Sequence, residues 1–305
     1  MPAWIARRLL AAVAVVIAVT TFTFFAIRLA PGDPITAFSD RPTVTPELLA
    51  QARRLYGYDR PLLEQYVTYV TSVLRGDFGP SVSLHRPVAA AIADAVPNTL
   101  LLAGAALLLD FLLGIALGVL QAARQHRLAD HAASAVTLFV YSLPTFWLGL
   151  VLLLVFGEQL GWFPVGGVTD PVLHPTMSWW GRMVDVARHL VLPAATLGLV
   201  GAAATARYQR GAVLEILRQD YVRTARAKGL SERRVLWGHV VRNALTPAVT
   251  LFGLSWPFLL TGAVLVESVF SWPGMGKLAV DAIYRRDYAL VTAAAIVAST
   301  MVVLG

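Results

Sequence analysis

Apolar runs of about twenty residues recur along the chain and alternate with shorter polar stretches. An α-helix needs about this length to cross the hydrocarbon core of a lipid bilayer. The runs occupy residues 9–29, 98–120, 132–156, 189–207, 246–266 and 290–305. This pattern predicts an all-α fold, a polytopic membrane protein of six transmembrane helices of which the last is cut short.

The two ends of the chain set its predicted topology. Arg7 and Arg8 precede the first apolar run, and by the positive-inside rule they place the N-terminus in the cytoplasm. That run is longer than the apolar core of a signal peptide and no small-residue cleavage site follows it, so we expect a retained helix. The last run stops at Gly305 after sixteen residues, and we expect the chain to continue beyond it.

Prolines mark the expected ends and bends of these helices. Pro97 is expected near the first turn of the second span, and Thr246 and Pro247 as the N-cap and a first-turn residue of the fifth. Pro144 lies in the middle of the third run and predicts a kink, because proline removes a helical hydrogen bond and clashes with the preceding turn.

Residues 31–95 form the one sizeable hydrophilic segment, predicted to be extracytoplasmic. Two parts of it, 46–56 and 62–74, have the spacing of amphipathic helices. The apolar face of the second part is expected to hold Tyr66, Val67, Val70 and Leu74. The predicted organisation is a first transmembrane helix at 1–30, the extracytoplasmic segment at 31–95 and a five-span core at 96–305.

A basic stretch at 207–243 separates the fourth and fifth runs. We expect two short helices in it: Asp220 caps the first, and Gly229 ends it because glycine tolerates the left-handed conformation of a helix C-terminus. Ser231 is the expected N-cap of the second, which runs to about Asn243. The nine basic residues of the stretch are Arg207, Arg210, Arg218, Arg223, Arg226, Lys228, Arg233, Arg234 and Arg242.

Composition supports a membrane protein and excludes several kinds of chemistry. Hydrophobic residues make up 57% of the 305 residues and charged residues only 14%, far from the soluble average. There is no cysteine, so disulfides, thiolate metal sites and cysteine nucleophiles are excluded. The net charge of +7 fits basic loops that fix topology, and no nucleic-acid recognition motif accompanies the basic stretch.

The centre of the basic stretch resembles the coupling loop of ABC importer permeases of the dipeptide, oligopeptide and nickel branch. The resemblance rests on Asp220-Tyr221-Val222-Arg223-Thr224-Ala225-Arg226-Ala227-Lys228-Gly229-Leu230 and on Arg242-Asn243-Ala244-Leu245-Thr246-Pro247. Arg223-Thr224-Ala225 stands where the wider superfamily has Glu-Ala-Ala, as is usual in this branch, and Gly229 keeps the superfamily's glycine. Gly238 departs from the branch, which more usually has an arginine there. Four further stretches of the sequence also resemble this branch, at 28–34, 58–61, 76–79 and 267–277.

The resemblance implies a permease subunit that couples ATP hydrolysis in separate subunits to alternating access of a pathway. The cargo it implies is a dipeptide or oligopeptide, with nickel chelates and oligosaccharides left open. The coupling loop would be 207–243. The residues implied to couple to the ATPase are Tyr221, Arg223, Thr224, Ala225, Arg226, Ala227, Lys228, Gly229 and Leu230.

Several partners follow from the same resemblance. They are a second homologous permease, two ATP-binding subunits, an extracytoplasmic substrate-binding protein and the lipid bilayer of a bacterial plasma (inner) membrane. ATP and Mg²⁺ would be bound by the ATP-binding subunits, and no cofactor is expected in this chain. The segment 31–95 would contribute to docking of the binding protein; the alternative is a packing excursion without a partner.

A few residues in or near the apolar runs are candidates for lining the pathway. For Asp110, inside the second run, the alternative is a buried hydrogen bond between helices, since an ionisable group at membrane depth faces protein or water. For Glu267 the alternatives are an ordinary solvated carboxylate and a group that binds an amine. Trp272, Pro273 and Gly274 resemble the branch's re-entrant outer segment, with a plain turn as the alternative. In the second run, Gly114 and Gly118 predict close packing against another helix.

The sequence lacks the motifs of an enzyme. A phosphate-binding loop needs a glycine five residues before Gly-Lys and a hydroxyl after it, but Ser271 and Leu278 occupy these places around Gly276-Lys277. His126 and His131 are five apart, not four, and none of the six histidines has metalloprotease spacing. We therefore predict no catalytic residue and no metal site. The rival functions are a membrane-embedded enzyme or a passive channel using Asp110 and Glu267.

Overall fold

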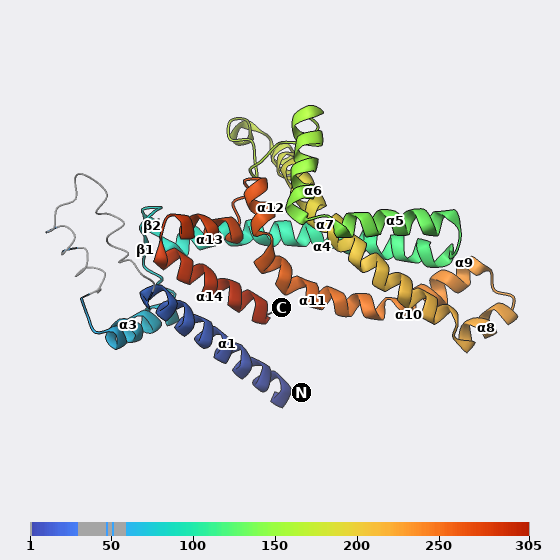
Figure 1. The fold of residues 1–305 in the computed structure, drawn as a ribbon, viewed down its shortest axis with the longest axis horizontal. Helices are drawn as coiled ribbons and strands as arrows, with labels where there is room; N and C mark the ends of the chain where they lie inside the picture. The colour runs from blue at the N-terminus through green and yellow to red at the C-terminus, as the bar shows by residue number, and fades with distance from the viewer. Residues whose placement is uncertain (1, 30–46, 48–50, 52–58, 305) are drawn as a thin grey trace. The chain divides into compact units, whose positions relative to one another are not determined.

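The computed structural model describes residues 2–29, 47, 51 and 59–304 (Figure 1). These residues form two compact units, one of residues 1–97 with 274–304 and one of residues 98–273. The regular structure in the described ranges is helical, apart from one antiparallel pair of two-residue strands, β1 (Pro80–Ser81) and β2 (Arg86–Pro87). The predicted all-α class is therefore confirmed.

The first unit contains α1 (Pro2–Leu29), α3 (Leu62–Leu74), β1, β2, the first turns of α4 (Val88–Ala123), α13 (Met275–Tyr284) and α14 (Tyr288–Leu304). Apolar side chains of α4, α13 and α14 make its core, among them Val88, Ile92 and Leu290. Asp287 is buried just before α14, and its carboxylate accepts hydrogen bonds from the hydroxyls of Ser81 and Ser83. These bonds tie the strand pair to α14.

The predicted start of the second span is wrong. α4 begins at Val88, ten residues before the apolar run at 98, so that Pro97 lies inside the helix and not in its first turn. Val88, Ala91, Ile92 and Ala95 recur at helical spacing and are buried in the core of the first unit. Tertiary burial of this face therefore extends the helix beyond its membrane-length apolar run.

The amphipathic helix predicted at 62–74 is confirmed as α3. Of the four residues predicted to share its apolar face, Tyr66 and Val70 are partly buried, whereas Val67 and Leu74 are exposed. The other predicted amphipathic part, 46–56, lies outside the described residues except for Glu47 and Gln51.

The second unit contains the rest of the helices. They are α5 (Leu128–Ser142), α6 (Thr145–Leu152), the π-helix η2 (Leu153–Gln159), the 3₁₀-helix η3 (His174–Thr176), α7 (Trp179–Leu217), α8 (Asp220–Ala227), α9 (Glu232–Val235), the π-helix η4 (Leu236–Val241), α10 (Arg242–Ala244), α11 (Thr246–Gly262) and α12 (Val264–Val269).

α7 is a single helix of 39 residues and is much longer than the predicted fourth span at 189–207. Ser178 caps its N-terminus by accepting a hydrogen bond from the backbone N–H of Gly181. At 1.5 Å per residue the helix measures about 58 Å, against about 30 Å for a hydrocarbon core. Residues 179–188, which precede the fourth apolar run, and residues 207–217 of the basic stretch therefore belong to this helix.

The third apolar run is broken, not kinked. The helix axis bends by 104° between α5 and α6, at Leu143 and Pro144. Leu143 adopts an extended backbone, with φ −76° and ψ 137°, which is the conformation that a following proline imposes. Pro144 also lacks the N–H that would donate to the preceding turn, so it cannot continue the hydrogen-bond ladder of α5. The sequence thus predicted the place of the bend and underestimated its size.

The fifth run forms two helices, α11 and α12, with Ala263 between them. Pro247 lies in the first turn of α11 as predicted. Thr246 is not the N-cap, because Leu245 holds that position with a helical backbone that continues from α10. The chain therefore passes from α10 into α11 almost without interruption.

Within the described residues, three helices are long and apolar enough to cross a membrane: α1 over Ala6–Ala26, α4 and α7. A fourth crossing results if the bent pair α5 and α6 counts as one span. Two shorter apolar stretches, Thr246–Ser255 and Tyr288–Val303, fall below this length. The length and composition of the described helices thus agree with a protein that crosses the membrane several times.

Glycines let α4 and α7 approach each other closely, as predicted for Gly114 and Gly118. A β-carbon added to Gly118 would lie 2.6 Å from the carbonyl oxygen of Ala206 and 2.7 Å from Cβ of Gln209. A β-carbon on Gly114 would lie 2.6 Å from Cβ of Thr205. Such distances are too short for real carbon atoms, so the two helices touch through glycine.

We expect Gly118→Ala to destabilise the second unit, because the added methyl group forces α4 and α7 apart. Overpacking of this kind costs about 1 to 3 kcal/mol. Gly104→Ala is the matched control on the same helix, since a β-carbon there meets no atom within 4 Å. Thermal unfolding in detergent, followed by tryptophan fluorescence, measures both. Equal melting temperatures of the two variants would contradict the close contact.

Candidate functional site

The resembling motif folds into an elbow, which we define as residues 220–244, from the start of α8 to the end of α10 (Figure 1). Its first arm is α8, whose N-cap is Gln219, so that Asp220 is the first helical residue and not the predicted cap. Val222 and Ala225 are buried and pack with Val213 of α7 and Val235 of α9. One face of α8 is thereby fixed to the protein, and the opposite face is exposed.

Gly229 ends α8 as predicted. Its φ of +81° lies in the left-handed region that glycine adopts without strain. The backbone N–H of Gly229 donates to the carbonyl of Arg226, and the N–H of Leu230 donates to the carbonyl of Ala225. These two bonds form a Schellman motif, which satisfies the last carbonyls of the helix. The glycine thus fixes the direction in which the chain leaves α8.

The second arm runs from α9 through the π-helix η4 into α10 and ends at Ala244, one residue after the predicted end. Ser231 occupies the N-cap position of α9 as predicted, but its side chain makes no capping hydrogen bond. π-Helical turns are uncommon and are frequent at functional sites. The arm therefore connects the turn at Gly229 to α11 through continuous helix.

Two side-chain contacts hold the arms together. The guanidinium of Arg226 donates from Nε and Nη2 to the two carboxylate oxygens of Glu232, at 2.9 and 3.2 Å. The side-chain amide of Asn243 donates to the Tyr221 hydroxyl at 3.2 Å. A bidentate pair restricts orientation as well as distance. The elbow is thus tied at its turn and at its base.

The predicted coupling residues fall into two groups. Arg223, Thr224, Ala227 and Lys228 are exposed on the outer face of α8, as are parts of Tyr221 and Arg226. Ala225 faces the interior and Leu230 is half-buried, so these two residues support the elbow and do not form its surface. Beside the turn, an open hollow of about 520 Å³ is lined by Ser231, Arg233, Arg234, Trp237 and Gly238.

An ion pair that the sequence did not reveal joins α7 to α5, three residues before Val213, which packs against the elbow. Arg210, predicted as part of the basic loop, lies on α7 and donates from Nε and Nη2 to the carboxylate of Asp130 on α5, at 3.1 and 2.9 Å. The Asp130 side chain is 3% exposed and that of Arg210 is 31% exposed. Asp130 also accepts from the backbone N–H of His126. The two residues are 80 positions apart, and no sequence pattern links them.

Asp110 forms a buried hydrogen bond between helices. Its carboxylate accepts from the hydroxyl of Thr205 on α7 at 2.7 Å, and the side chain of Asp110 is buried. This geometry is the buried hydrogen bond between helices that was the alternative to a pathway role for Asp110. A role of Asp110 in lining the pathway stays a prediction.

Glu267 is buried rather than solvated. It accepts a hydrogen bond from the hydroxyl of Thr99 on α4 at 3.0 Å, and 1% of its surface is exposed. Thr99 and Asp110 are eleven residues apart on α4, which corresponds to about 16 Å along the helix. The carboxylates of Asp110 and Glu267 therefore lie at different levels, and this separation does not suit a catalytic pair.

The segment after Glu267 is attached to the same part of α4. Trp272 is buried, and its indole N–H donates to the carbonyl of Asn98 at 2.9 Å. The side-chain amide of Asn98 donates in turn to the carbonyl of Pro273 at 3.0 Å. Gly274 follows as the N-cap of α13. Trp272 is thus part of the hydrophobic core of the second unit. A pathway role of Trp272, Pro273 and Gly274 stays a prediction.

Asp185 on α7 is a further buried carboxylate that the sequence did not single out. It accepts hydrogen bonds from the backbone N–H of Asp170 and lies 2.7 Å from Nδ1 of His174. Backbone N–H groups of Leu173 and Val172 donate to the Asp170 carboxylate and hold its pKa below the usual range. These contacts fasten the loop before α7 to the helix.

Comparison with known proteins covers both halves of the chain. Residues 114–305 match the family described as Binding-protein-dependent transport system inner membrane component. Residues 1–103 match the family described as Binding-prot-dependent transport system membrane comp, N-term.

Several curated relatives align along almost their whole length. The chain is 42% identical to the Di/tripeptide transport system permease protein DppB of Pseudomonas aeruginosa, covering 100% of this chain and 94% of that protein. It is 39% identical to the Oligopeptide transport system permease protein AppB of Bacillus subtilis, with 100% and 95% covered. It is 37% identical to the Dipeptide transport system permease protein DppB of Escherichia coli K12, with 99% and 93% covered.

We expect Asp130→Asn to destabilise the protein, because it leaves the Arg210 guanidinium without its counter-charge. Breaking a buried pair costs roughly 3 to 5 kcal/mol, and the partial exposure of Arg210 places this variant at the lower end. Asp220→Asn is the control, since that carboxylate is 95% exposed and lies 3.5 Å from Arg223. The loss of helical circular dichroism on heating measures both variants. A melting temperature of Asp130→Asn equal to that of the control would contradict the anchoring role.

Proposed function

Because the chain belongs to the family of binding-protein-dependent transport system inner membrane components, we propose that it is a permease subunit of an ATP-driven importer of short peptides. It is a multi-pass protein of the inner membrane. Its relatives are permeases of transport systems for dipeptides, tripeptides and oligopeptides, and this is the support for peptides as cargo.

The observation that carries the proposal is the elbow. It is basic, exposed on one face, and fastened on the other face to α7 and α4 through the apolar cluster around Val213, Val222 and Val235. A protruding helix that is rigidly joined to long apolar helices suits the transfer of a push from a soluble motor to the membrane. We assign the outer face of α8, with Arg223, Thr224, Ala227 and Lys228, to contact with an ATP-binding subunit.

The assembly we propose contains this chain, a second homologous permease, two ATP-binding subunits and an extracytoplasmic substrate-binding protein. ATP and Mg²⁺ are bound in the ATP-binding subunits. The chain itself crosses the membrane six times, with the N-terminus and the elbow on the cytoplasmic side, as Arg7, Arg8 and the basic residues of the elbow indicate. Segment 31–95 then faces outward, where a binding protein docks.

The proposed mechanism is a lever. Closure of the ATP-binding subunits moves the elbow, and the elbow moves α7, whose close contact with α4 carries the displacement into the membrane. Converting a 1:99 equilibrium of inward-open and outward-open states to 99:1 takes about 5.5 kcal/mol of differential binding. A loosely attached elbow would dissipate this energy in its own motion. The Schellman turn, the Arg226–Glu232 pair and the Arg210–Asp130 pair all oppose such motion.

We expect Gly229→Val to uncouple ATP hydrolysis from transport. A β-branched residue in the left-handed conformation is strained by about 1 to 2 kcal/mol, which shifts the turn and tilts α8 away from its docked position. Since 1.4 kcal/mol corresponds to a tenfold change in rate, peptide uptake should fall about tenfold while ATP hydrolysis continues. Uptake of a radiolabelled dipeptide and phosphate release are measured in the reconstituted complex.

Gly211→Val is the matched control, because Gly211 is exposed on α7 and a β-carbon there meets no atom within 4 Å. Co-purification of the ATP-binding subunits with each variant shows that the complex is assembled. Normal uptake by an assembled Gly229→Val complex would refute the lever. Uptake without any ATP-binding subunit would instead indicate a passive channel.

A further inference from the structure

The helix α3 has three distinct faces, of which one packs against the described part of the first unit. One face is aromatic, one is aliphatic and one is polar. The aliphatic face is exposed, although it carries no charged side chain. Such a face needs a partner. The place at which α3 is attached to α1 indicates which partner this is.

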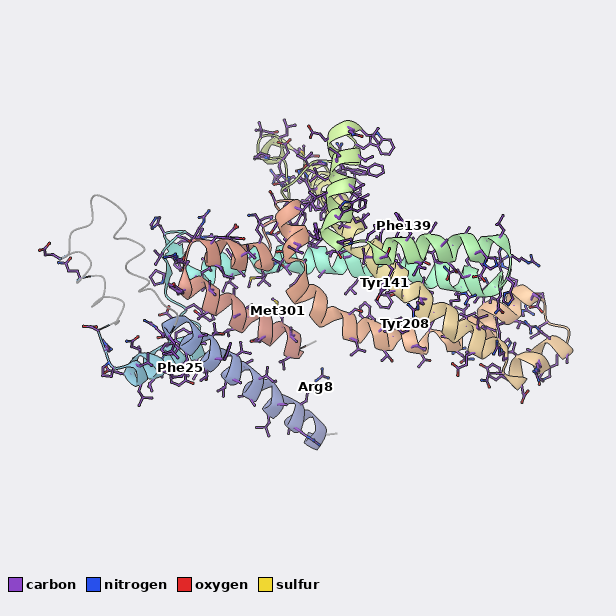
Figure 2. All side chains as sticks on the ribbon, viewed as in Figure 1. Arg8, Phe25, Phe139, Tyr141, Tyr208 and Met301 are labelled. Atoms are coloured by element: carbon purple, nitrogen blue, oxygen red, sulfur yellow. The ribbon has the colours of Figure 1, made fainter. Side chains whose placement is uncertain are left out.

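The aromatic face fixes α3 to α1. The ring of Tyr66 stacks on that of Phe25, with centroids 5.5 Å apart, and the ring of Tyr69 stacks on that of Phe24, at 5.4 Å. The hydroxyl groups of Tyr66 and Thr21 are 2.7 Å apart and share a hydrogen bond. Figure 2 labels Phe25 where the two helices meet. These contacts fix which way the other two faces of α3 point.

The aliphatic face is a stripe of Leu63, Val67, Val70 and Leu74. Their spacing of four, three and four residues places all four side chains on one side of a helix. Leu63 is 72% exposed, Val67 54% and Leu74 81%, and Val70 is partly buried. The polar face carries Glu64, Thr68 and Thr71, which are also exposed. A helix divided in this way is typical of one that lies in a membrane interface.

The place of attachment on α1 coincides with the end of its membrane-length apolar segment. This segment covers Ala6–Ala26, and the contacts with α3 are made by residues 21, 24 and 25. The last turn of a transmembrane helix lies at the boundary of hydrocarbon and headgroups, where tyrosine is enriched. Tyr66 and Tyr69 are therefore at the level at which tyrosines are found in membrane proteins.

The lipid-facing surface of α1 continues into this region. Leu10 is 71% exposed, Ile17 55% and Phe22 75%, and only 12% of the apolar segment is buried. Phe22 lies next to Thr21, which bonds to α3. At the two ends of α3, the exposed residues Arg60 and Arg75 are suited to phosphate groups of lipids.

From this continuity we propose that α3 lies flat in the membrane interface at the C-terminal end of α1, with the stripe of Leu63, Val67, Val70 and Leu74 inserted among the lipid acyl chains. The polar face with Thr68 and Thr71 then faces water. The helix acts as an interfacial anchor that fixes how deeply α1 enters the bilayer. The proposal depends on α1 spanning the membrane and is independent of the cargo and of the elbow.

The absence of cysteine from the sequence makes a direct test available. Leu63→Cys, Val67→Cys and Leu74→Cys place an environment-sensitive nitrobenzoxadiazole label on the stripe. Thr68→Cys and Thr71→Cys are the matched controls on the polar face of the same helix. Each labelled chain is assembled with cysteine-free partner subunits in nanodiscs, with and without lipids that carry a spin-label quencher near the headgroup.

We expect the quencher to lower the fluorescence of stripe labels at least twofold and to change that of the control labels by less than a fifth. Equal quenching of both sets would overturn the proposal, because the helix would then have no preferred face. Blue-shifted but unquenched stripe labels would also overturn it, since they would show that a protein partner covers the stripe. Only complexes that elute as intact assemblies are compared.

Discussion

The direct contact of α4 with α7 through glycine is the constraint on which the second unit depends. Lipid chains are as apolar as leucine, so helices in a membrane gain little by burying apolar side chains against each other. Their association relies on close packing and on hydrogen bonds between helices. Gly114 and Gly118 provide the first, and the bond between Asp110 and Thr205 provides the second. The two helices are thereby held in one register, in which neither slides along the other.

This register gives α7 its mechanical value. Because α7 continues without a break from Trp179 to Leu217, its last turns bring Arg210 to Asp130 and Val213 to the elbow. The elbow is therefore packed on the end of a long apolar helix and is not an independent loop. The turn of the elbow is made by Gly229, because a side chain with a β-carbon would strain the backbone at φ +81° and change the direction of the second arm.

The first unit is held together by different means. Its helices α4, α13 and α14 bury an ordinary apolar core, and the buried carboxylate of Asp287 fixes the strand pair β1 and β2 to α14. Aromatic rings connect α3 to α1 at the end of the apolar segment. From residue 59 onward, the polar stretch between the first two apolar runs is thus an ordered structure with its own contacts.

Local patterns in the sequence were enough to predict the membrane class, the turn at Gly229, the helix at 62–74, the glycine contact and the site of the bend at Pro144. Each of these depends on local chemistry: the length of an apolar run, the freedom of glycine, the periodicity of a helix, or the missing N–H of proline. The tertiary structure alone decided that α4 begins at Val88, that α7 absorbs residues 179–188 and 207–217, that Arg210 pairs with Asp130, and which sides of α3 are covered. These features arise between residues far apart in the chain, and their free energy comes from burial and pairing that no local pattern encodes.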